Sequence, residues 1–342
     1  MIYFNNDYMR GAHPLVLQRL IDTNLEQTAG YGDDNYTRQA RQRILDFCGL
    51  TDGEVHFLVG GTQTNATVID GLLARHEGVL ATRSAHIHVH ESGAIEASGH
   101  RVITLDEYEG KLSADIVRQF IDDFYRDETY EHMVAPGMVY ISHPTELGTL
   151  YTLDELKALS KVCRDAEIPL YMDGARLGYG LAADDTDVTA ADIARLCDVF
   201  YIGGTKAGAL FGEAVVIPQK DKLPHFRPLI KQHGALLAKG RLTALQFDAL
   251  FTDSLYLKIS RHAIRMAMKL KEGLLKKGYP LLIDSPTNQQ FFILPNADID
   301  RLATSVSFEL WGPRQEALTP VRFVTDWSTD EADVDALLNL IS

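Results

Sequence analysis

Short apolar runs alternate with longer amphipathic stretches between residues 55 and 217, and this alternation constrains the fold more than any other feature. The apolar runs predict strands, and the stretches between them have helical periodicity. Because parallel strands need crossover connections, this pattern predicts an α/β fold with a mostly parallel, seven-stranded sheet covered by helices. The predicted strands are residues 55–59, 79–81, 102–105, 138–141, 170–172, 199–202 and 214–217, and the predicted helices are residues 37–47, 64–75, 114–125 and 153–166.

The pattern changes after Pro218, where longer helical stretches replace the alternation. We predict helices over residues 223–238, 242–251 and 253–277, followed by strands at residues 290–294, 305–310 and 321–324. Helices and strands segregated in this way indicate a separate α+β unit. We therefore predict a large domain with an N-terminal arm at residues 1–245 and a smaller C-terminal α+β domain at residues 246–342.

Composition and charge restrict the partners of the chain. It has 342 residues, of which 46% are hydrophobic, and a formal net charge of −14. This charge argues against a nucleic-acid backbone or an anionic membrane as the main partner, although it is compatible with a local basic pocket for one phosphate. The N-terminus lacks the cationic start and apolar core of a signal peptide, and no apolar run has the length of a membrane span. We therefore expect a cytoplasmic protein without a membrane or nucleic-acid partner.

An acid and an amine follow two successive predicted strands. Asp173 comes directly after the apolar residues 169–172, and Lys206 follows residues 199–204. Open α/β sheets assemble their ligand sites at the carboxyl ends of strands. Pyridoxal 5′-phosphate (PLP) chemistry needs both groups, since a lysine holds its aldehyde as a Schiff base and an aspartate keeps its pyridine nitrogen protonated. Taken singly, Asp173 is compatible with a turn cap and Lys206 with a solvated surface residue.

The turn Gly60-Gly61-Thr62 lies between a predicted strand and a predicted helix. Its free backbone N–H groups and the threonine hydroxyl suit a phosphate at the positive end of the helix dipole. The same turn is also an ordinary way to begin a helix. What favours a cofactor site is the combination of this turn, a histidine, the aspartate and the lysine, each near the end of a predicted strand.

The histidine run at residues 86–90 has two interpretations. If extended, it would place His86, His88 and His90 on one face, as in a metal site. However, the run continues into residues 93–95, which predict a helix start, and Cys48, Cys163 and Cys197 show no metal-ligand spacing. The alternative is that one histidine stacks on a planar cofactor while the others are structural. We therefore expect no metal and three reduced cysteines that pack in the interior.

The sequence resembles the L-threonine aldolases of the low-specificity type, which are PLP enzymes with an aspartate-aminotransferase-like fold (fold type I). The specific part of the resemblance is Asp173-Gly174-Ala175-Arg176 together with Lys206. The resemblance covers nearly the whole chain, and its further matching segments are residues 4–7, 30–34, 61–65, 86–91 and 321–325.

The resemblance implies where PLP binds. Lys206 would carry the cofactor, Asp173 would pair with the pyridinium nitrogen, and His86 would lie over the ring. Arg241 would reach the phosphate of a neighbouring subunit. The complete cofactor-binding set implied in this way is Gly61, Thr62, His86, Asp173, Arg176, Thr205, Lys206 and Arg241.

The resemblance also implies the reaction and its substrate contacts. Arg176 and Arg322 would clamp the substrate carboxylate beside Asn6, because a planar guanidinium suits a carboxylate. A base, His86 or His143, would remove the proton of the β-hydroxyl group. The implied activity is cleavage of L-threonine, L-allo-threonine or a related β-hydroxy-amino acid to glycine and an aldehyde, by a homodimer or homotetramer. The implied catalytic residues are Lys206, Asp173, His86 and His143.

Several positions depart from the family pattern. Serine is usual in the family where this chain has Asn6, Gly60 and Thr205. Residues 145–148, Thr-Glu-Leu-Gly, replace an Asn-Arg-Cys-Gly-Gly segment near the expected β-substituent, which favours a substrate that is bulkier than threonine or different from it. Two other functions stay open: another PLP reaction such as β-elimination or transamination, and a non-catalytic role.

Overall fold

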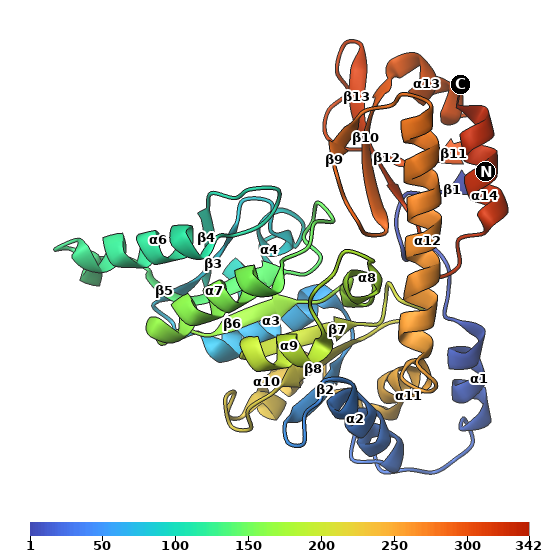
Figure 1. The fold of residues 1–342 in the computed structure, drawn as a ribbon. Coiled ribbons are helices and arrows are strands. Elements are labelled where there is room, and N and C mark those ends of the chain that lie inside the picture. The colour runs from blue at the N-terminus through green and yellow to red at the C-terminus, as the bar shows by residue number, and fades with distance from the viewer. Residues whose placement is uncertain (342) are drawn as a thin grey trace.

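The centre of the fold is a seven-stranded sheet in the computed structural model, which describes residues 1–341 (Figure 1). Its strands lie in the order β2-β8-β7-β6-β5-β3-β4. Strands β3 to β7 run parallel to one another, whereas β8 is antiparallel to both β2 and β7, so the predicted mostly parallel sheet is confirmed. The bounds are β2 (Glu54–Leu58), β3 (Glu77–Thr82), β4 (Arg101–Leu105), β5 (Ala135–Ser142), β6 (Leu170–Asp173), β7 (Val199–Gly203) and β8 (Glu213–Ile217).

Helices cover both faces of this sheet because successive side chains of its central strands point to opposite sides. On β5 and β6, Val139 and Met172 pack into one core, and Tyr140 and Tyr171 pack into the other. The first core is covered by α2 (Asn35–Phe47), α6 (Ala114–Arg126), α7 (Leu153–Asp165), α8 (Leu177–Ala182) and α9 (Ala190–Leu196). The second is covered by α3 (Gly61–Leu72), α4 (His86–Val89), α5 (Ala94–Ala97) and α10 (Phe226–Gln232).

The C-terminal part forms a separate layer of helices on a small sheet. Helix α12 (Leu255–Lys276) runs from α11 (Arg241–Leu250), beside the large sheet, to this small sheet (Figure 1). The small sheet is antiparallel, with β9 (Leu281–Ile283), β10 (Gln289–Pro295), β12 (Glu309–Leu310) and β13 (Leu318–Val324) in the order β12-β13-β10-β9. It is accompanied by α13 (Asn296–Leu302) and α14 (Glu331–Leu340). Within residues 1–341, no helix is both long and apolar enough to cross a membrane.

The N-terminal segment joins both parts of the molecule. Strand β1 (Ile2–Tyr3) pairs in parallel with β11 (Val306–Ser307), and Phe4 is buried in the C-terminal core. Helix α1 (Pro14–Asp22) then packs against α11. The first residues therefore lie with the C-terminal layer, although the chain returns at once to the large sheet. The domain boundary between residues 245 and 246 stays a prediction.

Two predicted elements differ from the structure. The helix predicted over residues 223–238 is only the shorter α10, because the chain turns at Gly234 into the left-handed region (φ 72°), which ends a helix. The strand predicted over residues 305–310 is divided between β11 and β12, which belong to different sheets. The other predicted helices and strands are confirmed within a few residues.

The turn after β6 packs directly against the end of β7. Gly203 N–H donates to the Gly174 carbonyl at 2.9 Å. A Cβ at Gly174 would lie 1.9 Å from the Tyr201 carbonyl oxygen, and a Cβ at Gly203 would lie 2.2 Å from the Ala175 carbonyl oxygen. Only glycine permits this approach of two backbones, so these glycines bring the residues that follow β6 and β7 together.

We expect Gly174→Ala to destabilise the protein by about 1–3 kcal/mol or more, because the added methyl group would overlap backbone that has no room to move. Thermal or denaturant unfolding of purified protein measures this loss. Gly60→Ala is the matched control, since its backbone is extended (φ −164°) and nothing lies within 4 Å of the added Cβ. Equal stability of the Gly174→Ala variant and the parent would contradict the close approach of the two strands.

Candidate active site

Asp173, the last residue of β6, is a buried carboxylate with a full set of donors. Tyr201 donates to Oδ1 at 2.6 Å, and the Ala175 N–H donates to the same oxygen at 2.9 Å. Tyr140 donates to Oδ2 at 2.7 Å and Asn65 at 3.0 Å. Burial alone would raise the pKa of Asp173, but the hydrogen bonds from Tyr201 and Tyr140 and the charge of His86 lower it below its ordinary value. Asp173 is therefore held as an anion.

A hydrogen-bonded network extends from Asp173 to the first histidine. Asn65, on α3, also donates to Glu91 Oε1 at 2.7 Å, and its own oxygen accepts from Tyr171 at 2.9 Å. Glu91 Oε1 lies 2.8 Å from His86 Nδ1. The network fixes the side chains beside Asp173, which come from strands on both sides of β6 and from α3.

His86 begins α4, and its ring lies at the cavity edge. Burial lowers the pKa of His86, but the hydrogen bond to Glu91 and the charges of Glu146 and Asp173 outweigh burial and raise it above its ordinary value. The run at residues 86–90 is helical and not extended. Only His86 of the three alternating histidines is withdrawn from solvent, because His88 and His90 are exposed.

Lys206 follows β7 at the same edge of the sheet. Burial and the nearby charge of Arg176 lower the pKa of Lys206, whereas Asp7, Glu146 and Asp173 oppose this effect. A lowered pKa favours the neutral amine, which is the nucleophilic form. Lys206 therefore has the environment of a reactive lysine.

The N-terminus of α3 faces the same space. Gly60 precedes the helix and no side chain caps it, so the first-turn N–H groups of Gly61 and Thr62 have no side-chain partner at the N-cap. The side-chain oxygen of Thr64, in this same turn, is buried without a hydrogen-bond partner. The open space at Gly60 and the positive end of the helix together suit a phosphate.

These groups line one cavity of ≈ 310 Å³. It contains Lys206, Asp173, His86 and Thr205, together with the glycine turn. The full lining is Tyr8, Val59, Gly60, Gly61, Thr62, His86, Glu91, Glu146, Asp173, Ala175, Tyr201, Thr205, Lys206, Phe211 and Glu213. An ionised aspartate, a reactive amine and an uncapped helix start are the groups that a pyridine nitrogen, an aldehyde and a phosphate require, so the residues fit PLP.

Two predicted substrate-binding arginines do not line this cavity. Arg176 makes a buried bidentate ion pair with Asp7, with Nε to Oδ2 at 2.8 Å and Nη2 to Oδ1 at 3.0 Å. Arg322, on β13, donates to Gln289 at 2.8 Å and pairs with Glu309. Burial and the charge of Arg176 lower the pKa of Arg322, and its Nε has no hydrogen-bond partner.

The structure does not bring three other predicted residues to this cavity. Asn6 accepts from the N–H of Tyr8 at 3.1 Å and lines a different hollow beside residues 1–4. His143 is fully buried, and its Nδ1 accepts from the Tyr151 N–H at 3.4 Å. Arg241 lies at the outer surface, where it donates to the Glu26 carbonyl at 2.9 Å.

Two carboxylates in the cavity were not predicted from the sequence. Glu213 opens β8 and is buried, with Oε1 accepting from Thr205 at 2.9 Å and Oε2 without a partner. Glu146 accepts from the Ser142 hydroxyl at 3.3 Å. Glu146 lies in the segment that departs from the family pattern, and this departure was a feature of the sequence that could have identified it as a site residue. Glu213 follows Gly212 at the start of an apolar strand, where a buried acid is unusual.

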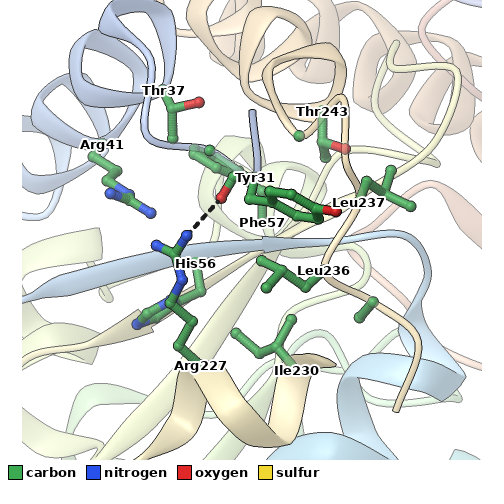
Figure 2. Close-up of a pocket in the computed structure, with 13 residues that line it drawn as sticks. Tyr31, Thr37, Arg41, His56, Phe57, Arg227, Ile230, Leu236, Leu237 and Thr243 are labelled. Atoms are coloured by element: carbon green, nitrogen blue, oxygen red, sulfur yellow. Dashed lines mark hydrogen bonds between the residues drawn. The ribbon is translucent and has the colours of Figure 1, made fainter. Parts of the chain in front are cut away.

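A smaller hollow lies beside the first half of α2, where Thr37 and Arg41 line it together with Tyr31 (Figure 2). Arg227 donates to the Tyr31 carbonyl at 3.1 Å, and Arg41, His56 and Phe57 complete this side of the wall (Figure 2). Its volume of ≈ 30 Å³ holds about one or two water molecules. It contains neither Lys206 nor Asp173, so it is not the candidate active site.

Known proteins match this chain along most of its length. The β-eliminating lyase family matches residues 12–296. A low-specificity L-threonine aldolase from Pseudomonas aeruginosa is 29% identical over 331 residues, which cover 96% of this chain and 93% of that protein. A structure of a threonine aldolase from Leishmania major is 41% identical to this chain, with a TM-score of 0.96. The match covers 99% of this chain and 98% of the aldolase chain. An aspartate aminotransferase from Thermus thermophilus, at 14% identity and a TM-score of 0.73, shares the fold and covers 99% of this chain and 90% of its own.

We expect Glu213→Gln to change how stability depends on pH. Burial raises the pKa of Glu213 from 4.5 to about 8, against the hydrogen bond from Thr205 and the charge of Lys206. Between these values the folded protein keeps a proton that the unfolded chain has lost, so this contribution to stability is complete below pH 4.5 and is lost as the pH rises through 8. The parent should therefore lose a few degrees of Tm relative to the Gln variant between these two pH values.

Melting curves of both proteins across this pH range check the expectation. Glu128→Gln, at an exposed position, is the matched control and should follow the parent. Parallel curves for the parent and the Glu213→Gln variant would show that Glu213 titrates normally.

Proposed function

This chain belongs to the β-eliminating lyase family, and from this membership we propose that it cleaves L-threonine, L-allo-threonine or a related β-hydroxy-amino acid to glycine and an aldehyde. It is a PLP-dependent lyase with the aspartate-aminotransferase-like fold. The observation that carries the proposal is the single cavity in which Lys206, Asp173 and His86 meet. The relatives named threonine aldolase support the choice of reaction.

Five groups from different parts of the chain would hold the cofactor. Lys206 would carry its aldehyde carbon on Nζ, and the anionic Asp173 would keep the ring nitrogen protonated. The first turn of α3 and Thr205 would bind the phosphate, and His86 would lie against the ring. When bound, PLP supplies the electron sink that lets a bond to the amino-acid Cα break heterolytically.

The substrate carboxylate would be oriented by Arg322 and Arg176, near Asn6. Arg322 has a buried Nε–H without a hydrogen-bond partner among the described residues, an unsatisfied donor that is consistent with a carboxylate-binding role. Arg176 is held by Asp7 and would add positive charge behind this site. A fixed carboxylate places the Cα–Cβ bond in a defined orientation, and this positioning supplies much of the barrier reduction in such reactions.

The two predicted histidines differ in their suitability as bases. His86 lines the cavity, where it can exchange protons with a bound substrate. His143 is fully buried, and burial lowers its pKa to about 4, so it would serve as a neutral structural group beside β6. Its backbone N–H donates to the Asp173 carbonyl at 2.9 Å, which supports the strand end that carries Asp173.

We further propose that the enzyme works in the cytoplasm as a homodimer or homotetramer. Arg241 supports this because it lies on the outer surface, outside the cavity of its own chain. From that position its guanidinium could reach the phosphate site of a neighbouring subunit. The acidic net charge of −14 gives no support for a nucleic-acid partner.

The purified enzyme should release acetaldehyde and glycine from L-threonine or L-allo-threonine without a keto-acid acceptor. Lys206→Ala should lower this rate by several orders of magnitude and remove the visible band that borohydride abolishes in the parent, because no other lysine lines the cavity among the described residues. A coupled aldehyde assay and absorption spectra measure both effects. Lys277→Ala, at an exposed position, is the control.

The panel of substrates in this assay should include phenylserine, since the segment at residues 145–148 favours a larger β-substituent. Release of ammonia from serine or cysteine with no aldehyde from any β-hydroxy-amino acid would replace the aldolase proposal by β-elimination. A requirement for a keto-acid acceptor would replace it by transamination.

Asp173→Asn should retain bound PLP but reduce kcat by orders of magnitude, because a neutral amide does not keep the ring nitrogen protonated. Equilibrium dialysis gives the cofactor affinity, and steady-state kinetics give kcat. Thermal melts identify any loss of the network with Tyr140 and Tyr201. Turnover within a few-fold of the parent would remove Asp173 from the mechanism.

A further inference from the structure

We propose that Glu146, and not a histidine, takes the proton from the substrate β-hydroxyl group, an inference that rests on the proposed function. Glu146 stands in the segment that departs from the usual family pattern. In the structure, Glu146 lines the same cavity as Lys206 and Asp173.

Glu146 reaches the cavity from the loop after β5. This loop leaves the strand at His143 and Pro144 and closes through the Thr145 N–H, which donates to the Thr149 carbonyl at 3.0 Å. The flanking side chains Thr145 and Thr149 are buried, with their hydroxyl oxygens 2.7 Å apart. The Glu146 side chain is only half-buried and lines the same cavity as Lys206 and His86. The loop is thus anchored while its carboxylate is accessible to a ligand.

The Glu146 carboxylate influences the pKa values of three titratable groups in or near the cavity. Its negative charge contributes to the raised pKa of His86 and of Arg176, and it partly opposes the lowering of the Lys206 pKa by burial and by Arg176. Arg176 is one of the two arginines proposed to orient the substrate carboxylate, and Lys206 is the proposed cofactor lysine. Glu146 is therefore close to both the proposed cofactor lysine and one of the arginines proposed to orient the substrate carboxylate.

Ser142 lies behind Glu146. Its hydroxyl is 3.3 Å from Glu146 Oε1 and 3.3 Å from the Tyr140 hydroxyl oxygen. Because Tyr140 gives its own proton to Asp173, the single Ser142 proton is donated to one of these two acceptors at a time. Ser142 lies at one oxygen of Glu146, and among the described residues the other oxygen has no hydrogen-bond partner. This second oxygen is available to a substrate hydroxyl group.

The two histidines are less suited to this step. His143 does not line the cavity, and its Nε2 is buried without a partner. The pKa of His86 is raised, so a larger fraction of His86 already carries a proton at neutral pH and cannot accept another. Its Nδ1 is also engaged by Glu91 at 2.8 Å.

Glu213 also lines the cavity without a charged hydrogen-bond partner, but it is buried, and burial raises its pKa and so favours its protonated form. Glu146 is half-buried, and its hydrogen bond among the described residues comes from Ser142.

In the proposed step, the O–H bond of the substrate β-hydroxyl group breaks and its proton passes to a Glu146 carboxylate oxygen. The O–H electron pair becomes the second C–O bond of the aldehyde as the Cα–Cβ bond breaks. The Cα–Cβ electron pair stays with the Cα fragment, which becomes glycine when a proton is returned to Cα.

Glu146→Gln in the PLP-loaded enzyme tests this role, because glutamine keeps the size and the contact with Ser142 but accepts no proton. We expect kcat for aldehyde release from threonine to fall by about 10²–10⁴-fold. Exchange of the glycine α-proton with solvent should stay within a few-fold of the parent, since that step involves no β-hydroxyl group. Threonine affinity, from spectral titration of the bound cofactor, should also stay within a few-fold.

Two further variants separate a base from a structural residue. Glu146→Ala should lose the same cleavage activity and regain part of it with added formate, which can replace the missing carboxylate. Glu146→Asp should cleave faster than the Gln variant, because it retains a carboxylate. Glu128→Gln is the matched surface control and should behave like the parent.

The outcomes distinguish this proposal from the proposed function. Aldehyde release by the Gln variant within a few-fold of an active parent would overturn the role of Glu146 and leave the aldolase proposal standing. An equal loss of aldehyde release and glycine exchange, with no rescue by formate, would also overturn it in favour of a structural role. A parent that exchanges the glycine proton but releases no aldehyde from any substrate would instead overturn the proposed function.

Discussion

The site depends on one interaction, the stabilisation of a buried negative charge at the end of β6. Asp173 is 4% exposed, and an isolated carboxylate at such a position would be protonated. Donors from β5, β7 and α3, together with the N–H of Ala175, compensate the cost of desolvation and lower its pKa. The elements that carry these donors must therefore meet at this point, and the order of the central strands satisfies that requirement. A pyridine nitrogen bound beside Asp173 would keep its proton, because the lowered pKa of Asp173 keeps this carboxylate negatively charged.

Around this anion, in the cavity lining and behind it, lie acids and cations whose charges influence one another. Lys206 has a lowered pKa and Glu213 a raised one, so both groups are shifted toward their neutral forms by burial. Arg176 is compensated by Asp7 and Arg322 by Glu309. Neither Glu146 nor Glu213 forms an ion pair of this kind among the described residues, but Glu213 is buried whereas Glu146 is half-buried in the cavity wall. This difference in accessibility is the physical reason for assigning a chemical role to Glu146.

Local signals predicted most elements of the large sheet and misplaced those that depend on contacts with other elements. The strands at Asp173 and Lys206 are continuous apolar runs, which is typical of parallel strands buried on both faces. In contrast, α10 ends early at a left-handed glycine, and residues 305–310 divide between two sheets because β11 finds its partner in the N-terminal strand β1. A pairing between residues so distant in sequence leaves no periodic pattern in either segment.

The sequence alone determined that the chain is an α/β protein and that Asp173 and Lys206 follow successive strands, because hydrophobic periodicity and strand ends are local properties. Its motifs also identified the glycine turn and His86 as parts of the same site. Only the tertiary structure decided which other side chains face that site. It brought Glu146 and Glu213 to the cavity and left His143 buried, with Arg241 on the outer surface. Burial and the direction of a side chain depend on packing between distant segments, and no spacing of residues along the chain encodes them.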